Sequence, residues 1–132
     1  MWGRTNDMIP IKTSDAPLPS GPYSQAIISG DLVYVSGQIP IDHVSGTIPD
    51  GTEEQIKIAM RNLVSILSAA GVERGHVLRV TVYLRDMNDF AVMNSIYAET
   101  FDTPYPARTC IGVSSLPKDV KIMIDAVGEL GH

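Results

Sequence analysis

Residues 52–70 constrain the fold more than any other stretch, because their apolar side chains recur every three or four positions. That spacing is typical of one face of an amphipathic helix. The stripe comprises Ile56, Ala59, Met60, Leu63, Ile66, Leu67 and Ala70. Thr52 and Gln55 have the spacing of a capping box, and Gly71 is the residue type that commonly ends a helix. The sequence therefore predicts a helix over 52–70 whose apolar stripe packs on a sheet.

The segment 76–85 alternates between apolar and polar residues, which is typical of a strand with one buried face. We expect Leu78, Val80, Val82 and Leu84 on the buried face and Arg79, Thr81, Tyr83 and Arg85 on the other. Further strands are predicted at 8–13, 25–29, 32–38, 107–113 and 121–127, and a second helix at 89–101. Gly30-Asp31 separates two apolar runs, as in a hairpin.

This order of elements predicts an α+β fold in which one mixed six-stranded sheet carries two helices on one face. The other face of the sheet must then be covered, and a second copy of the chain is the simplest cover. We therefore expect a homo-oligomer. With 132 residues, of which 44% are hydrophobic and 19% charged, the chain suits a single globular domain spanning 1–132, with residues 1–7 as a flexible tail.

Charge and cysteine content limit the classes of function. The net charge is −5 and the ten Lys and Arg are scattered, which disfavours non-specific binding to nucleic acid. Cys110 is the only cysteine, and the three histidines are far apart in sequence, so neither a disulfide nor a metal site is expected. Without a secretory signal or a membrane-length apolar run, the chain is expected to be cytoplasmic, or mitochondrial if its source is a eukaryote.

Arg108 is the strongest candidate for chemistry, because it lies in a predicted strand and its fork of donors suits a carboxylate. The alternative is a structural salt bridge, for example with Asp125. Cys110 shares the strand face of Arg108, and we interpret it as a buried inert thiol rather than a nucleophile. Tyr23 lies in a stiff loop where it either serves a pocket or simply packs. Gly37 ends a strand, where it permits a close approach or marks a bulge.

Several segments together resemble the RidA family, also called YjgF or L-PSP proteins, over nearly the whole chain from about Ile9 to Val127. The matching segments are Gly21–Gln25, Val35–Pro40, Asn88–Phe90 with Asn94, Pro106–Cys110 and Leu116–Val120. The resemblance implies a chorismate-mutase-like fold and a homotrimer with pockets between subunits. It also implies hydrolysis, without a cofactor, of enamines and imines such as 2-aminoacrylate, 2-iminopropanoate and 2-iminobutanoate to 2-keto acids and ammonia.

In that reading Arg108 clamps the substrate carboxylate, and Arg108 and Tyr23 are the catalytic residues. The substrate-binding set comprises Arg108, Ser36, Gly37, Phe90, Asn94, Ala107, Cys110 and Met123. The expected partner is a small 2-imino or 2-keto carboxylate, and no interaction with a membrane is expected.

Two positions depart from the family pattern. Many deaminases of the family carry a Glu where this chain has Met123, and some relatives carry a Glu where it has Gly112. A thioether cannot accept a proton from the attacking water. Asp125 shares the strand face of Met123 and could act through a second water or pair with Arg108. Three functions therefore stay open: an imine deaminase, a carboxylate-binding protein without turnover, and an endoribonuclease or translation inhibitor of the L-PSP type.

Overall fold

The computed structural model describes residues 8–131 and has the predicted order of elements. The strands are β1 (Ile9–Ile11), β2 (Ala26–Ser29), β3 (Leu32–Gln38), β4 (Val77–Leu84), β5 (Ala107–Gly112) and β6 (Ile122–Glu129). The helices are α1 (Thr52–Ala70) and α2 (Phe90–Thr100), with short 3-10 turns at Arg74–His76, Met87–Asp89 and Pro117–Asp119. The expected tail, residues 1–7, lies outside the described residues.

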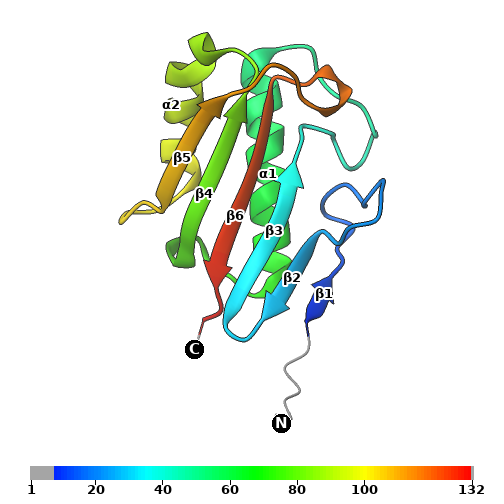
Figure 1. The fold of residues 1–132 in the computed structure, drawn as a ribbon, viewed down its shortest axis with the longest axis vertical. Helices are drawn as coiled ribbons and strands as arrows, with labels where there is room; N and C mark the ends of the chain where they lie inside the picture. Colours follow the sequence, from blue (N-terminus) through cyan, green and yellow to red (C-terminus); the bar gives the residue numbers. More distant parts are fainter. Residues whose placement is uncertain (1–7, 132) are drawn as a thin grey trace.

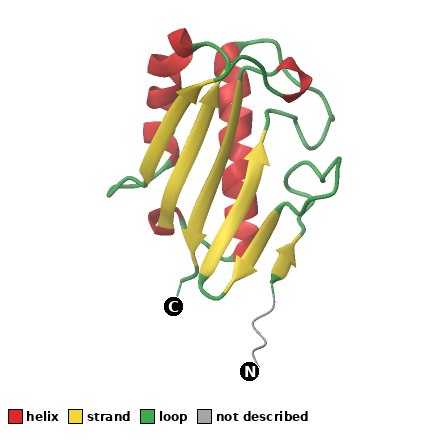
Figure 2. Ribbon diagram, viewed as in Figure 1, coloured by secondary structure: helices red, strands yellow, loops and turns green. Residues whose placement is uncertain are grey.

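The six strands form one mixed sheet in the order β1-β2-β3-β6-β4-β5, with both helices behind it (Figures 1 and 2). Only the β4–β5 pair is parallel, because α2 connects these two strands as a crossover. The hairpin between β2 and β3 is confirmed, with Gly30 at a φ of 62° in its turn. The prediction of an α+β fold with one sheet and two helices on one face is thus confirmed.

The apolar stripe of α1 forms the centre of the core. Ile56, Leu63 and Ile66 have no exposed surface, and α1 packs mainly on the inward side chains of β3 and β6. Burial of each such side chain contributes about 1.5–3 kcal/mol to folding. Gly71 ends the helix at a φ of 95°, and its N–H bonds to carbonyls of the last turn, as predicted.

The predicted capping box of α1 is wrong. Gly51 is the N-cap, Thr52 already belongs to the helix, and no side chain caps the first turn. The side chain of Gln55 instead donates to the Pro49 carbonyl at 2.8 Å and accepts from the Lys121 N–H at 2.9 Å. The buried amide of Gln55 therefore connects two loops and does not cap the helix.

The strict alternation predicted for β4 holds only from Arg79 onward. The register with β6 shifts between Val77 and Arg79, so Val77 is buried and Leu78 is exposed. A bulge inserts one residue into a strand and reverses the facing of the side chains before it. The face of Leu78 was therefore predicted wrongly, whereas Val80, Val82 and Leu84 are fully buried as expected.

Candidate functional site

Arg108 lies on β5, at the edge of the sheet, and its side chain faces α2 rather than the open face. Its Nη1 donates to Asn94 Oδ1 at 2.7 Å. The guanidinium carbon lies 4.8 Å from the centre of the Tyr97 ring and 5.7 Å from that of Phe90. Phe90, Asn94 and Tyr97 all belong to α2, at helical spacing. The helix therefore supplies two hydrogen-bond acceptors, Asn94 and the Met93 sulfur at 3.9 Å, and two aromatic faces that orient the cation.

No carboxylate among residues 8–131 lies within ion-pair distance of Arg108. The alternative of a salt bridge with Asp125 is wrong. Asp125 lies on β6, two strands away, and it accepts a hydrogen bond at 2.8 Å from the Tyr83 hydroxyl on the open face. Arg108 is half-buried and oriented, and most of its donors remain available. Such a group can hold an external carboxylate.

Cys110 lies two residues further along the same face of β5. Burial raises the pKa of its thiol, and the positive charge of Arg108 opposes that rise only in part. The thiol is therefore protonated at neutral pH, as expected of an inert cysteine and not of a nucleophile. Ala107, which opens the strand, is exposed at the sheet edge beside Arg108.

Tyr97 is the residue of this cluster that sequence reasoning missed, because its position also fits an ordinary apolar stripe. Burial raises its pKa to about 12, although the charge of Arg108 lowers it. Its hydroxyl is buried and has no hydrogen-bond partner among the described residues. The helical spacing of positions 90, 94 and 97 was the signal that could have placed it beside Arg108.

A second cluster surrounds the end of β3. Met123 lies over Gly37, where a Cβ would come within 2.8 Å of the Met123 sulfur. The register between β3 and β6 shifts between Val35 and Gln38. Gly37 therefore lies in a bulge and also permits the close approach of Met123. The Ser36 hydroxyl donates to the Ser24 carbonyl at 2.6 Å, which ties this strand end to the loop that carries Tyr23.

Tyr23 is half exposed, and its hydroxyl accepts from the Ser20 N–H at 3.4 Å. Tyr23 and Gly37 line a cavity of about 70 Å³, together with Lys118. Lys118 was not predicted as a site residue; it stands in a tight turn at a φ of 55°, a conformation that costs a lysine free energy. No spacing in the sequence pointed to it.

The sheet separates the two clusters within one chain. Arg108, Asn94, Phe90 and Cys110 lie between β5 and α2, whereas Met123 lies on the open face. Their strands are two steps apart, which is about 10 Å across a sheet. Within one chain, each cluster therefore contains only some of the predicted site residues.

Within residues 8–131, no three His, Cys, Asp or Glu side chains could hold a metal ion, and no helix has the length and apolar character to cross a membrane.

Comparison with known proteins decides the family. The sequence model described as endoribonuclease L-PSP matches residues 13–130. The chain belongs to this family. A RutC family protein of Pyrococcus horikoshii is 51% identical over 118 residues, covering 89% of this chain and 94% of that protein. The 2-iminobutanoate/2-iminopropanoate deaminase of Salmonella typhimurium is 40% identical over 120 residues, which cover 89% of this chain and 94% of that protein.

Solved structures of the L-PSP family agree with this fold. The crystal structure of Escherichia coli TdcF with bound serine superposes with a TM-score of 0.89 at 39% identity, covering 93% of this chain and 99% of that one. The crystal structure of the Escherichia coli YjgF gene product superposes with a TM-score of 0.86 at 38% identity, covering 92% of this chain and 98% of that one. The resemblance inferred from the motifs is thus confirmed, and it extends to relatives named as imine deaminases.

Proposed function

We propose that this protein hydrolyses small 2-imino acids, such as 2-iminopropanoate and 2-iminobutanoate, to 2-keto acids and ammonia. The observation that carries the proposal is Arg108, an oriented guanidinium without a carboxylate partner in the described part of the chain. A fork of N–H donors at a sheet edge suits the carboxylate that all these substrates share. Relatives named for this deamination support the reaction class.

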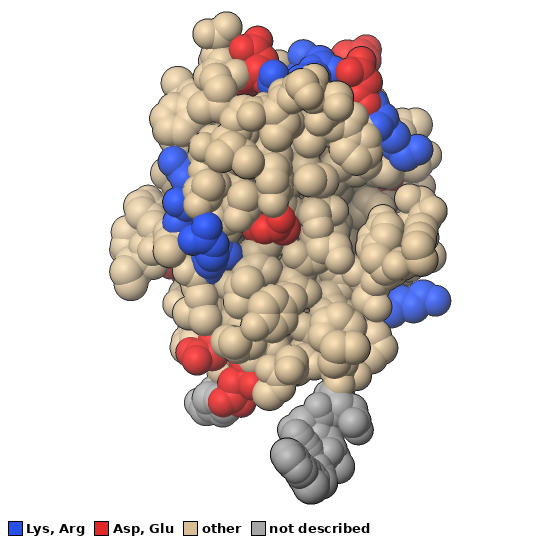
Figure 3. Space-filling model, in the orientation of Figure 1, with Lys and Arg blue, Asp and Glu red and all other residues tan. Residues whose placement is uncertain are grey.

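We further propose that the active site forms between copies in a homotrimer, with Arg108 from one copy and Tyr23, Gly37 and Met123 from its neighbour. Within one chain these residues cannot meet across the sheet. The open face of the sheet carries few charged side chains over its middle (Figure 3). Tyr34 and Ile111 are 47% and 43% exposed on it. An apolar face of this kind is suited to burial against another copy.

The chemistry asks little of the protein beyond positioning. The imine carbon is electrophilic, so a water oxygen adds to it and the nitrogen takes up a proton. The resulting carbinolamine then collapses, the C–N bond breaks and ammonia leaves with the keto acid. In this scheme Arg108 holds the carboxylate and thereby fixes the carbon, while the Tyr23 hydroxyl hydrogen-bonds water or nitrogen as the proton moves. Backbone groups near Gly37 and Cys110 line the polar end.

Met123 favours a second candidate, a carboxylate-binding protein without turnover. The sulfur lies over Gly37, where a carboxylate of similar reach would hold and deprotonate water. A thioether leaves that role unfilled, and Asp125 is engaged by Tyr83. The endoribonuclease activity in the family's name has less physical support, because a chain of net charge −5 repels a phosphate backbone.

The deciding experiment generates 2-aminoacrylate in situ with a serine dehydratase and follows pyruvate release with and without this protein. Arg108→Ala and Arg108→Lys are assayed in parallel, since lysine keeps the charge and loses the fork. We expect the wild type to accelerate pyruvate release. Arg108→Ala should lose this acceleration, and Arg108→Lys should keep part of it.

Three outcomes would each revise the proposals in a different way. No acceleration, combined with 2-ketobutyrate binding that depends on Arg108, would establish the binding protein. Acceleration that survives Arg108→Ala in a folded protein would show that the carboxylate clamp is misassigned. Sedimentation of the wild type as a monomer at assay concentration would refute the site between copies.

A further inference from the structure

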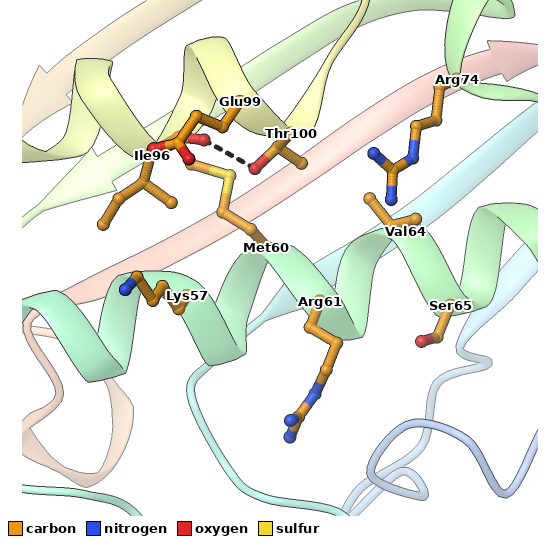
Figure 4. A pocket seen from close by; sticks show the side chains of 9 residues that line it. All are labelled: Lys57, Met60, Arg61, Val64, Ser65, Arg74, Ile96, Glu99 and Thr100. Carbon is orange, nitrogen blue, oxygen red and sulfur yellow. Dashed lines mark hydrogen bonds between the residues drawn. The ribbon is translucent and has the colours of Figure 1, made fainter.

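A groove runs between α1 and α2 on the side of the molecule away from the open sheet face (Figure 4). It encloses a cavity of about 430 Å³, within the range of small-molecule sites. The groove is lined by Lys57, Met60, Arg61, Val64, Ser65, Arg74, Ile96, Glu99 and Thr100. We call these nine residues the helix groove.

The helix groove gathers positive charge on an acidic protein. Lys57 and Arg61 project from α1, and Arg74 reaches toward Val64 from the turn that comes after the helix (Figure 4). These are three of only ten Lys and Arg in a chain of net charge −5. Glu99 is the single carboxylate in the lining. Positive charges around a concave site attract anions more strongly than the same charges on a flat surface.

The partners of these cations hold them loosely. Lys57 lies 3.5 Å from Glu53, and both side chains are about 60% exposed; Arg61 lies 3.5 Å from Asp42. Charge-assisted hydrogen bonds are normally about 2.7–2.9 Å, and exposed pairs of this kind contribute little. Within residues 8–131, no carboxylate lies within ion-pair distance of Arg74.

Asp42 does not depend on Arg61. The pKa of its carboxyl is lowered first by hydrogen bonds from the N–H groups of Val44 and Ser45, and Arg61 contributes less. The loop thus keeps Asp42 ionised by itself. Arg61 can turn to another anion without leaving an unsatisfied carboxylate behind.

The floor of the helix groove is apolar. Met60 and Ile96 are 2% and 7% exposed and lie between the two helices (Figure 4). Ser65 and Thr100 add hydroxyls, and the Thr100 hydroxyl donates to the Ile96 carbonyl, which leaves its oxygen able to accept. An apolar floor beneath a cationic rim suits a ligand with an apolar body and a multiply charged end.

We propose that the helix groove binds a small phosphomonoester with an apolar body. A phosphomonoester carries a charge near −2 at neutral pH, and its oxygens match arginine forks. The site is separate from Arg108, because Asn94 and Tyr97 face Arg108 while Ile96 and Glu99 face α1. It also stays accessible when the open sheet face is covered, so this proposal does not rest on the deaminase assignment.

The test titrates 1-naphthyl phosphate into the ¹⁵N-labelled full chain and monitors amide shifts. We expect shifts in α1, α2 and the Arg74 turn, and weaker binding at higher salt. Arg74→Gln should weaken binding at least tenfold, and Glu99→Gln should tighten it severalfold because it removes the repelling carboxylate of the lining. Lys12→Gln, an exposed cation beyond β1, is the matched control and should change nothing. Arg108→Ala should also bind as the wild type does.

Four results would overturn the proposal. Equal binding of 1-naphthol would show a plain apolar cleft, and equal affinity in Arg74→Gln would exclude the arginine. Weaker binding by Glu99→Gln would mean that the carboxylate supports the groove rather than opposing an anion. Shifts with an RNA oligonucleotide but none with 1-naphthyl phosphate would assign the surface to nucleic acid. The gain expected of Glu99→Gln cannot arise from misfolding.

Discussion

The Arg108 cluster and the Met123 cluster carry different parts of the proposed site. The first is polar and oriented, with a cation held by Asn94 and two aromatic rings. The second has a thioether packed on Gly37. Under the proposed function, this difference would separate substrate binding from water activation. The proposed carboxylate anchor lies on one side of the sheet, whereas the side that would position water has an apolar group.

The largest expected effect concerns the anchor. Arg108→Ala removes charge-assisted bonds worth about 1.5–3 kcal/mol each, so two bonds correspond to roughly a hundred- to ten-thousandfold loss in kcat/KM. We expect 2-ketobutyrate binding to disappear in calorimetry while the thermal unfolding midpoint stays close to that of the wild type. Binding that persists in this variant would remove the distinction between the clusters.

The second prediction adds an acid at the position of Met123. Met123→Glu should raise the rate of imine hydrolysis about ten- to a hundredfold, because positioned acid–base groups contribute at least that much. Met123→Gln, which has the same reach and no ionisable group, is the control and should give no such gain. If a folded oligomer of Met123→Glu is no faster than the glutamine variant, Met123 is not at the water site.

Asn94 tests whether orientation of the guanidinium matters. Asn94→Ala should raise KM about tenfold, since it removes one hydrogen bond to a charged group. Asn94→Asp should also weaken binding, because a carboxylate there occupies Arg108 as an internal partner. An aspartate variant that binds 2-ketobutyrate as well as the wild type would refute this role.

A smaller effect is expected at the contact between Gly37 and Met123. Gly37→Ala places a methyl group 2.8 Å from the sulfur, so the flexible Met123 side chain must move. We expect about 1 kcal/mol lower free energy of unfolding in a denaturant titration. The second substitution Met123→Ala should reduce that penalty. Equal penalties in both backgrounds would show that the thioether does not fill this space.

The smallest effect concerns Cys110. Burial raises its pKa, so the reactive thiolate should appear only above the pH at which an ordinary thiol ionises. Alkylation by iodoacetamide at pH 8 should be several times slower than for a cysteine peptide. Neutralising the nearby charge in Arg108→Ala should slow it further, because that charge now lowers the pKa. Rapid alkylation at pH 7 would reopen the nucleophile interpretation.

Elements with strong periodicity were predicted closely. The helix Thr52–Ala70 and the strand Leu32–Gln38 have the predicted bounds, and the other elements differ by at most a few residues at their ends. The errors occur where long-range contacts outweigh local preference. Gln55 bonds to two loops instead of capping its helix, and a bulge exposes Leu78.

The site was predicted as a set of residues but not as an arrangement. Arg108 and Cys110 could be placed on one strand face by alternation, whereas Asn94 entered the predicted site only through the family resemblance. Its bond to Arg108 spans 14 residues of sequence and depends on how α2 crosses β5. The helix groove is similar, because its cations come from α1 and the turn after it, whereas its opposite wall exists only when α2 packs beside α1.

The amino-acid sequence alone was enough to predict the element order, the apolar stripe that selects a two-layer fold, and the family motifs. These are properties of local spacing and residue type. Only the tertiary structure decided that Arg108 faces α2 while Met123 faces the open side, and that Asp125 pairs with Tyr83. Strand order and helix packing set these relations, and both depend on contacts between residues far apart along the chain.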